Sequence, residues 1–289
     1  MADKSDRVKY LIAKENECLK EKLDAASKIM KNCHFCERRC GANRKEGERG
    51  WCGVLEPKIS SEFLHFGEES ELIPSHTIFF TGCTFACRYC QNLDISQYPK
   101  RGIYIEPEIL VKLIVKRKQE GARNVNWVGG DPAPDIPYIL GVLNRCNVNT
   151  PQVWNSNMYL TEESLNILEG VMDIYLTDFK YGNDSCAERL SGVGNYREII
   201  TRNHKIISDR NNKIIIRHLV LPEHLECCTF PVLRWISKNL NPENVKVNVM
   251  GQYHPEWKAR DYGEINRRLT RDELERAMRF ADGLGLELC

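Results

Sequence analysis

Three cysteines in one short loop are the most distinctive chemical feature of this 289-residue sequence. Cys83, Cys87 and Cys90 have the spacing C-x3-C-x2-C, and Tyr89 stands directly before the last of them. Three thiolates at this spacing can wrap one loop around a [4Fe–4S] cubane and ligate three of its irons. The fourth iron then has no protein ligand and is open to a small molecule. Because electron-transfer clusters of this type use four cysteines, the loop predicts a reactive cluster.

A second group of cysteines lies nearer the N-terminus. Cys33, Cys36, Cys40 and Cys52 supply four thiolates within twenty residues. This number completes either one tetrahedral zinc site or one ordinary [4Fe–4S] cluster, and the spacing does not choose between the two. Glycines and charged residues fill the intervals, so a metal could fold the segment where no hydrophobic core is possible. The scattered cysteines are interpreted as ordinary buried or surface thiols: Cys146, Cys186, Cys227, Cys228 and Cys289.

The composition argues against several classes of protein. Charged residues make up 28% of the chain, yet the net charge is only +1, without the basic excess of a dedicated nucleic-acid-binding protein. A basic run from Arg38 to Arg49 is interpreted as a solvated loop. No stretch reaches the roughly 18 consecutive apolar residues of a membrane span, and the N-terminus lacks the apolar core of a secretion signal. We therefore expect a cytoplasmic protein whose thirteen cysteines serve metal or redox chemistry rather than disulfides.

The elements that must position these cysteines follow from the pattern of apolar residues. Short apolar runs predict six strands, over residues 77–80, 125–128, 152–154, 173–177, 214–221 and 245–250. Helical patterns separate them, over residues 106–119, 136–144, 161–169, 195–209, 225–239 and 270–282, with capping boxes at Thr161 and Thr270. This alternation predicts an α/β fold of parallel β/α units with right-handed crossovers. We expect one N-terminal amphipathic helix within residues 1–32, a cysteine-rich extension over 33–75 and the main domain over 76–289.

Polar residues follow several of these strands. Cys83 comes after the first strand, Gly129, Gly130 and Asp131 after the second, and Asp178 after the fourth. In a β/α barrel, this end of the strands holds the active site. Arg217 lies within the apolar run of the fifth strand, so its charge must face a polar cavity or find a partner.

The cysteine loop resembles the signature of radical S-adenosylmethionine (SAM) enzymes, with Tyr89 as the aromatic residue before the last cysteine. The resemblance covers residues 76–255 and implies a partial (β/α)6 barrel. It also implies that the open iron binds the amino and carboxylate groups of SAM. An electron from the reduced cluster then cleaves the sulfonium, and the resulting 5′-deoxyadenosyl radical abstracts hydrogen.

The same resemblance suggests residues that contact SAM. Gly129, Gly130 and Asp131 are similar to the family's Gly-Gly-Glu motif, which contacts the methionine amino group; Asp131 is one methylene shorter than Glu. Ser156 lies in the turn Asn155-Ser156-Asn157, where related activating enzymes carry a short polar turn.

Four further residues complete the expected SAM site. Asp178 and Lys180 are similar to the Asp-x-Lys pair that brackets SAM in glycyl-radical-enzyme activases. Arg217 could pair with the methionine carboxylate, and His254 is similar to the histidine that approaches the ribose.

The segment from Cys33 to Gly53 resembles the N-terminal extension of a branch related to pyruvate formate-lyase activating enzyme. This implies hydrogen abstraction from a protein or peptide substrate, with a flavodoxin- or ferredoxin-type electron donor. Two alternatives stay open: radical modification of a small metabolite or nucleotide, and a non-catalytic iron–sulfur scaffold or redox sensor.

Overall fold

The computed structural model describes residues 7–67 and 69–289, so the first six residues of the expected 1–32 segment lie outside the described residues. The chain divides into two compact units. The first comprises Met1–Thr84, Asp94–Ser156 and Leu160–Tyr175, and the second comprises Phe85–Leu93, Asn157–Tyr159 and Leu176–Cys289. The three-cysteine loop therefore starts in the first unit and continues in the second.

The strands confirm the expected α/β fold class. Seven strands occur in the sheet in their order along the chain: β1 (Ile59–His65), β2 (Ser75–Phe80), β3 (Asn124–Gly129), β4 (Gln152–Ser156), β5 (Ile174–Asp178), β6 (Lys213–Leu219) and β7 (Val245–Met250). The six predicted strands correspond to β2–β7. The sequence reasoning missed β1.

The first unit contains the parallel strands β2, β3 and β4, with β1 antiparallel to β2. Most residues of these three parallel strands are buried, which explains why they read as continuous apolar runs. In β1, by contrast, only Ile59 is buried, and the sequence ISSEFLH has no continuous apolar run. Phe63 of β1 stacks on Phe79 of β2, with ring centroids 5.6 Å apart.

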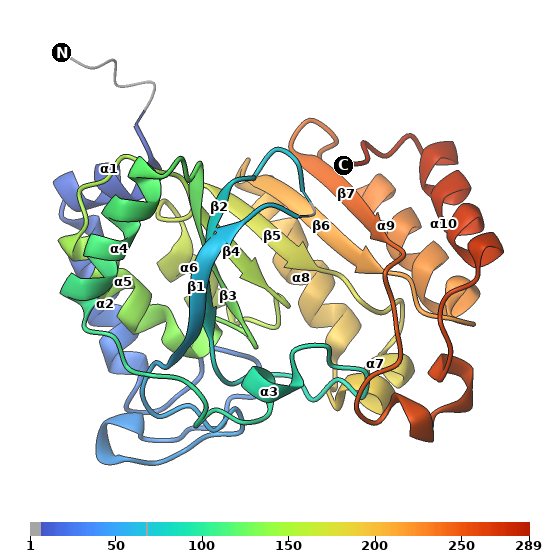
Figure 1. Ribbon diagram of the computed structural model, residues 1–289, viewed down its shortest axis with the longest axis horizontal. Coiled ribbons are helices and arrows are strands. Elements are labelled where there is room, and N and C mark those ends of the chain that lie inside the picture. The colour runs from blue at the N-terminus through green and yellow to red at the C-terminus, as the bar shows by residue number, and fades with distance from the viewer. Residues whose placement is uncertain (1–6, 68) are drawn as a thin grey trace. The chain divides into compact units, whose positions relative to one another are not determined.

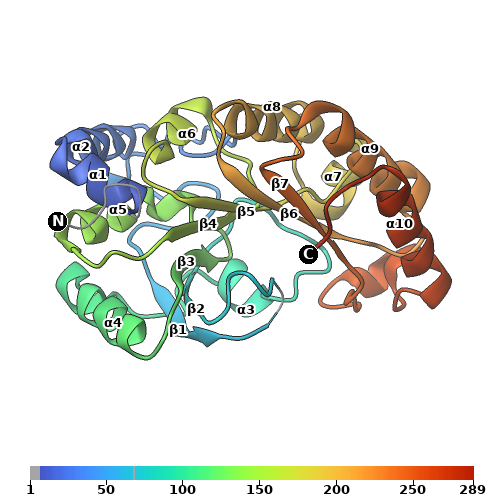
Figure 2. The same ribbon diagram turned by 90° about the horizontal axis from the view of Figure 1, so that it is seen from above.

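Helices of the first unit pack beside this part of the sheet (Figure 1). They are α1 (Lys9–Glu15), α2 (Cys18–Ile29), α4 (Pro107–Gln119), α5 (Ile136–Arg145) and α6 (Glu162–Leu168). The short helix α3 (Leu93–Ser96) and the 3-10 turns η2 (Arg44–Glu46) and η3 (Ala133–Asp135) lie in connecting loops. Helix α2 packs against α5 and α6 (Figure 2). Thr161 caps α6 by accepting a hydrogen bond from the backbone N–H of Ser164. The reciprocal bond of the predicted capping box is not formed, because the backbone N–H of Thr161 donates to Phe35 O over 3.3 Å instead.

The single N-terminal helix expected from the sequence is wrong. Two helices, α1 and α2, meet at Asn16 and Glu17, and Glu17 adopts a left-handed backbone with a φ of 60°. The imperfect apolar stripe of this segment did not reveal the break, because both halves bury apolar residues at helical spacing.

The second unit contains the parallel pair β6 and β7 and the helices beside it (Figure 2). These are α7 (Asp184–Ser191), α8 (Tyr196–Asp209), α9 (Phe230–Asn239) and α10 (Arg271–Gly283), with 3-10 turns η5 (Ala259–Asp261) and η6 (Gly263–Ile265). Thr270 and Glu273 form the predicted capping box of α10. The helix predicted over residues 225–239 is instead a π-helical turn, η4 (Leu225–Thr229), followed by α9. Among the described residues, no helix combines the length and apolar character needed to cross a membrane.

Candidate functional site

In the first unit, the loop after β3 is fastened to the start of the cysteine loop after β2. The backbone N–H of Gly130 donates to Phe80 O over 3.0 Å, and that of Asp131 donates to Gly82 O over 3.0 Å. A Cβ at Gly129 would lie 2.1 Å from Phe80 O, and one at Gly130 would lie 2.0 Å from Gly82 O. Both glycines are therefore required for the close approach of the two backbones.

Asp131 is buried at the end of this contact. One oxygen, Oδ1, accepts a hydrogen bond from the backbone N–H of Ala133 over 3.0 Å, at the start of η3. This bond fixes the orientation of the carboxylate. Cys83, the first cysteine of the three-cysteine loop, is also buried in the first unit.

The N-terminal cysteines influence one another electrostatically. Burial raises the pKa of Cys36, and the nearby Cys52, Asp131 and Cys33 raise it further. Burial also raises the pKa of Cys52 to about 11, with Cys33 acting in the same direction. Cys40 Sγ lies 3.7 Å from Cys33 O. The raised pKa values favour the protonated thiols of Cys36 and Cys52 in the metal-free protein, so a metal that binds these two residues must displace protons.

Two buried ionisable residues, Asp135 and Arg44, adjoin these thiols, and the sequence did not indicate the burial of either. Burial raises the pKa of Asp135 to about 8, Arg44 opposes this rise, and Asp131 adds to it. Within the described part of the chain, neither carboxylate oxygen of Asp135 has a hydrogen-bond partner. Arg44 donates from Nη1 to Pro134 O over 2.6 Å. The interpretation of the basic run as a solvated loop is therefore wrong at Arg44, which is only 5% exposed.

The cysteine-rich segment also contacts the start of the three-cysteine loop. Arg38 donates from Nε to Thr84 O over 3.0 Å, while its guanidinium lies 3.8 Å from the ring centroid of Trp51. A Cβ at Gly82 would lie 2.2 Å from Val54 Cγ2 and 3.2 Å from Cys52 O. Within the first unit, the N-terminal cysteines are therefore neighbours of the segment that carries Cys83.

In the second unit, a chain of hydroxyl groups ends at the sulfur of Cys87. Ser191 donates from Oγ to Cys87 Sγ over 2.9 Å. Tyr181 OH lies 2.6 Å from Ser191 Oγ, and Tyr89 OH lies 2.7 Å from Tyr181 OH. The backbone N–H of Ala86 donates to Ser191 O over 3.0 Å, which fixes the loop to the end of α7.

Asp178 and Lys180 lie beside this sulfur. Burial raises the pKa of Cys87 to about 11; the positive charge of Lys180 lowers it, and Asp178 raises it. Lys180 Nζ pairs with Asp178 Oδ2 over 2.8 Å, and the backbone N–H of Lys180 donates to Tyr196 OH over 2.7 Å. The second unit thus brings together the middle cysteine of the loop and both residues of the Asp-x-Lys pair.

Comparison with known proteins identifies the group to which this arrangement belongs. Residues 77–236 match the sequence profile of the radical SAM superfamily. The chain belongs to the radical SAM superfamily. An uncharacterized protein of Methanocaldococcus jannaschii is 54% identical to this radical SAM protein over 273 residues, which cover 92% of this chain and 79% of the relative.

Two solved structures of low sequence identity share the fold. A radical SAM methyltransferase from Sphaerobacter thermophilus superposes with a TM-score of 0.53 and 12% identity over 75% of this chain and 66% of that chain. SuiB of Streptococcus suis, bound to its precursor peptide SuiA, superposes with a TM-score of 0.51 and 14% identity over 71% of this chain. The match spans 46% of the SuiB chain. At these identities the likeness establishes the fold alone.

Membership of the superfamily implies a [4Fe–4S] cluster and SAM, and the surroundings of Cys87 fit an iron–sulfur cluster. Thiolate ligands carry negative charge, which Lys180 can balance and to which Ser191 Oγ already donates. Cys90 lies near Cys87 in the same loop, and its backbone N–H donates to Cys87 O over 3.1 Å. Sequence reasoning missed Ser191 and Tyr181, because nothing in their local sequence indicates a contact with the cysteine loop.

The remaining predicted residues have defined places. Ser156 is the buried last residue of β4 in the first unit. Arg217 lies in β6 opposite Asn248 of β7, and its carbonyl accepts from Phe179 N–H over 3.0 Å. His254, whose side chain is 39% exposed, has Nδ1 3.1 Å from Glu256 Oε1.

Proposed function

We propose that this protein is a radical SAM enzyme that abstracts a hydrogen atom from a protein or peptide, in the manner of a glycyl-radical-enzyme activase. The observation that carries the proposal is the placement of the Asp178–Lys180 ion pair beside Cys87. This arrangement brings the proposed cluster ligand Cys87 next to the two charged residues that are expected to bracket SAM.

In this proposal, Cys83, Cys87 and Cys90 hold the cluster and leave one iron free for SAM. The cluster, when bound, supplies the electron that cleaves SAM to methionine and a 5′-deoxyadenosyl radical. Ser191 stabilises the Cys87 thiolate by its hydrogen bond, and Tyr181 holds the Ser191 hydroxyl in place. Tyr89 packs its buried ring against Tyr253, with centroids 5.7 Å apart, and so braces the loop.

The polar residues after the strands would orient SAM. Gly129, Gly130 and Asp131 would contact the methionine amino group, with the Asp131 carboxylate held by the N–H of Ala133. Ser156, at the end of β4, would also contact SAM.

Four further residues suggested by the sequence would contact SAM. Asp178 and Lys180 would bracket it, Arg217 would pair with the methionine carboxylate, and His254 would approach the ribose. None of these residues needs to act as a general base, because the reactive group belongs to the cofactor.

A peptide substrate is supported by precedent for the fold. SuiB, which shares the fold, was solved with its precursor peptide bound. A substrate backbone could reach a radical formed at the polar ends of the strands. If the enzyme modifies a small metabolite or nucleotide but no peptide, radical modification of small molecules would be favoured instead.

The four N-terminal cysteines would hold a second metal centre, either zinc or a [4Fe–4S] cluster. The supporting observation is the mutual electrostatic influence of Cys33, Cys36 and Cys52, beside the segment that carries Cys83. A flavodoxin- or ferredoxin-type protein in the cytoplasm would deliver the electron.

The test is an anaerobic assay of the reconstituted full chain. Iron and sulfide are counted, the protein is reduced, and 5′-deoxyadenosine is measured after addition of SAM. We expect 5′-deoxyadenosine from the wild type and the Cys289→Ala control, and none from Cys87→Ala. No 5′-deoxyadenosine from a fully loaded wild-type cluster would overturn catalysis and favour the scaffold or redox-sensor alternative. About four irons per chain would leave zinc for the N-terminal cysteines, and about eight would indicate a second cluster.

A further inference from the structure

Two cysteines and a histidine bring their ligand atoms together in the second unit, away in sequence from both cysteine groups described above. One ligand atom each of Cys186, His224 and Cys227 lies within 4.8 Å of the others. The Sγ atoms of Cys186 and Cys227 are 3.9 Å apart, and the Sγ of Cys228 is 3.8 Å from that of Cys227. Two sulfurs bound to one tetrahedral zinc ion at about 2.3 Å lie about 3.8 Å from each other. The observed spacing therefore fits zinc without rearrangement of the thiols.

The imidazole of His224 offers a lone pair on a defined nitrogen. Its Nδ1 lies 2.7 Å from Pro222 O, and since a carbonyl oxygen only accepts, Nδ1 carries the proton. Its Nε2 lies 3.3 Å from Arg189 Nη2, and since a guanidinium only donates, Nε2 carries the lone pair. Metal-binding histidines show this arrangement, with the second ring nitrogen donating to a carbonyl or carboxylate. A metal would take this lone pair in place of Arg189, whose guanidinium also pairs with Glu264.

The side chain of Asn183 connects the two segments that carry the cysteines. Asn183, the N-cap of α7, accepts from Cys186 N–H over 2.8 Å and donates from Nδ2 to Cys227 O over 2.8 Å. The same Nδ2 lies 3.4 Å from Cys186 Sγ, where it can donate to a thiolate. A Cβ at Gly182 would lie 2.5 Å from Cys227 O and 2.9 Å from Cys228 Cα, so only glycine allows this approach.

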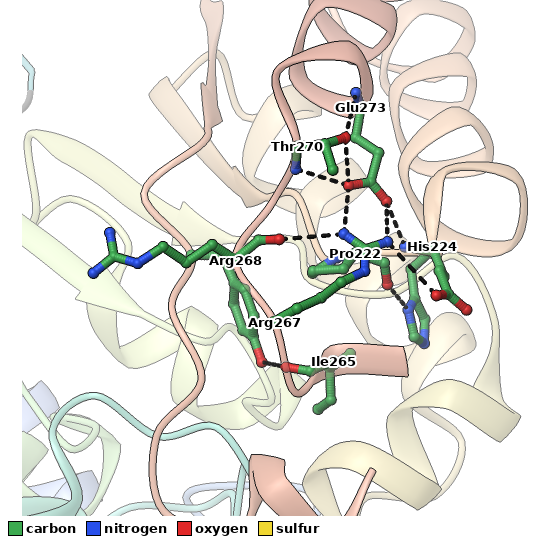
Figure 3. A network of polar contacts seen from close by, with 9 residues as sticks. Pro222, His224, Ile265, Arg267, Arg268, Thr270 and Glu273 are labelled. Atoms are coloured by element: carbon green, nitrogen blue, oxygen red, sulfur yellow. Dashed lines mark hydrogen bonds and ion pairs between the residues drawn. The ribbon is translucent and has the colours of Figure 1, made fainter. Parts of the chain in front are cut away.

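The loop that carries His224 is held by a network of polar contacts (Figure 3). The carboxylate of Glu273 accepts from the backbone N–H groups of Glu223 and Thr270, each over 2.9 Å, and pairs with Arg267. The π-helical turn η4 follows at once, with Cys228 N–H donating to His224 O over 3.0 Å. Single π-helical turns are rare and frequently occur at functional sites. Here the turn places Cys227 and His224 on the same side as Cys186.

We propose that Cys186, His224 and Cys227 bind a zinc ion. Binding would release the thiol protons to solvent and leave neutral imidazole and thiolates as ligands. The ion would join the start of α7 to the π-helical turn before α9. Because α7 also carries Ser191, the site would brace the helix that donates to Cys87.

The test compares two double variants of the full chain that each lose two thiols. Cys186→Ser/Cys227→Ser removes proposed ligands, and Cys146→Ser/Cys289→Ser is the matched control. After purification with added zinc, we expect the first variant to hold one zinc per chain fewer than the wild type, and the control to equal the wild type. Equal zinc content in all three proteins would overturn the proposal. The proposal would also be overturned by a second result. In that result, the wild type purified without oxygen contains a Cys186–Cys227 disulfide, and Cys186→Ser/Cys227→Ser holds as much zinc as the wild type.

A second measurement tests the proposal even if the double variant Cys186→Ser/Cys227→Ser fails to fold. His224→Ala keeps every thiol, and we expect its zinc affinity to fall by about 100-fold or more. Cobalt(II) added to the zinc-depleted wild type should give the intense visible bands of a tetrahedral thiolate site. The bands should change in His224→Ala and persist unchanged in Cys146→Ser/Cys289→Ser. Identical cobalt spectra for His224→Ala and wild type would remove the histidine from the site and contradict the proposal.

Discussion

The hydroxyl of Ser191 donates a hydrogen bond to the sulfur of Cys87 over 2.9 Å. Hydrogen bonds to cluster sulfurs stabilise the more negative, reduced state and so raise the reduction potential. We expect Ser191→Ala to lower the potential of the reconstituted cluster by tens of millivolts, at about 60 mV for each 1.4 kcal/mol lost. A redox titration followed by electron paramagnetic resonance would measure the shift.

Ser191→Thr is the matched control, because it keeps the hydroxyl and should hold the wild-type potential. Iron content should be the same in all three proteins. An unchanged potential in Ser191→Ala would mean that this hydroxyl does not bond to the loaded cluster.

Lys180 places a positive charge beside Cys87 through its pair with Asp178. Its removal leaves the Asp178 carboxylate facing the cluster without a counter-charge. Since a hydrogen bond to a charged group contributes about 1.5–3 kcal/mol, we expect Lys180→Ala to weaken SAM binding or slow 5′-deoxyadenosine formation by roughly 10- to 100-fold. Lys205→Ala removes an equivalent partner from Asp209 on the exposed face of α8 and should behave as wild type. Equal losses in both variants would refute the specific role of Lys180.

Gly130 is the point of closest approach between the two loops of the first unit. A methyl group there would lie 2.0 Å from Gly82 O, and backbone on both sides leaves it no room. We expect Gly130→Ala to displace the start of the cysteine loop, reduce iron incorporation and lower the thermal stability. Gly141→Ala in α5 is the control, since its Cβ would meet only the end of Arg145 at 3.7 Å. Helix propensity predicts that Gly141→Ala leaves stability unchanged or raises it by up to about 1 kcal/mol.

The sequence predicted β2–β6 from short apolar runs and β7 from the alternation of apolar and polar residues in VKVNVM. It missed β1, whose single paired edge needs few apolar residues, and α7, which is eight residues long and lacks a clear apolar stripe. The break at Glu17 depends on a left-handed backbone that no glycine marks. Local patterns therefore predicted the strands that carry the site but not the shorter elements that support it.

The candidate site was predictable where its residues are adjacent in sequence. Cys83, Cys87 and Cys90 form one motif, and Asp178 and Lys180 follow one strand. The contact of Cys186 with Cys227 joins residues 41 positions apart, and neither spacing nor composition indicates such a pair. Ser191 reaches Cys87 across 104 positions for the same reason. Contacts of this kind come from tertiary packing, which a single sequence does not display.

The raised pKa of Asp135 predicts how the stability of the protein depends on pH. Burial raises its folded pKa to about 8, whereas an unfolded aspartate titrates near 3.9. Between these values the native metal-free protein holds one proton more than the unfolded chain at this residue. The stabilising contribution of Asp135 is therefore complete below about pH 4 and is lost as the pH rises to about 8. The loss amounts to about 1.4 kcal/mol for each pH unit within this range.

Asp135→Asn cannot titrate at this position, so its stability should not carry that contribution. We expect the free energy of unfolding of the wild type minus that of Asp135→Asn to decrease steadily from pH 5 to pH 8 and then become constant. Urea unfolding of both metal-free proteins at each pH would measure this difference, in which all other titrating groups cancel. Asp209→Asn, which removes an exposed carboxylate from α8, should show no such trend. Parallel stability curves for wild type and Asp135→Asn would show that Asp135 is already ionised in the fold, with Arg44 as its effective counter-charge.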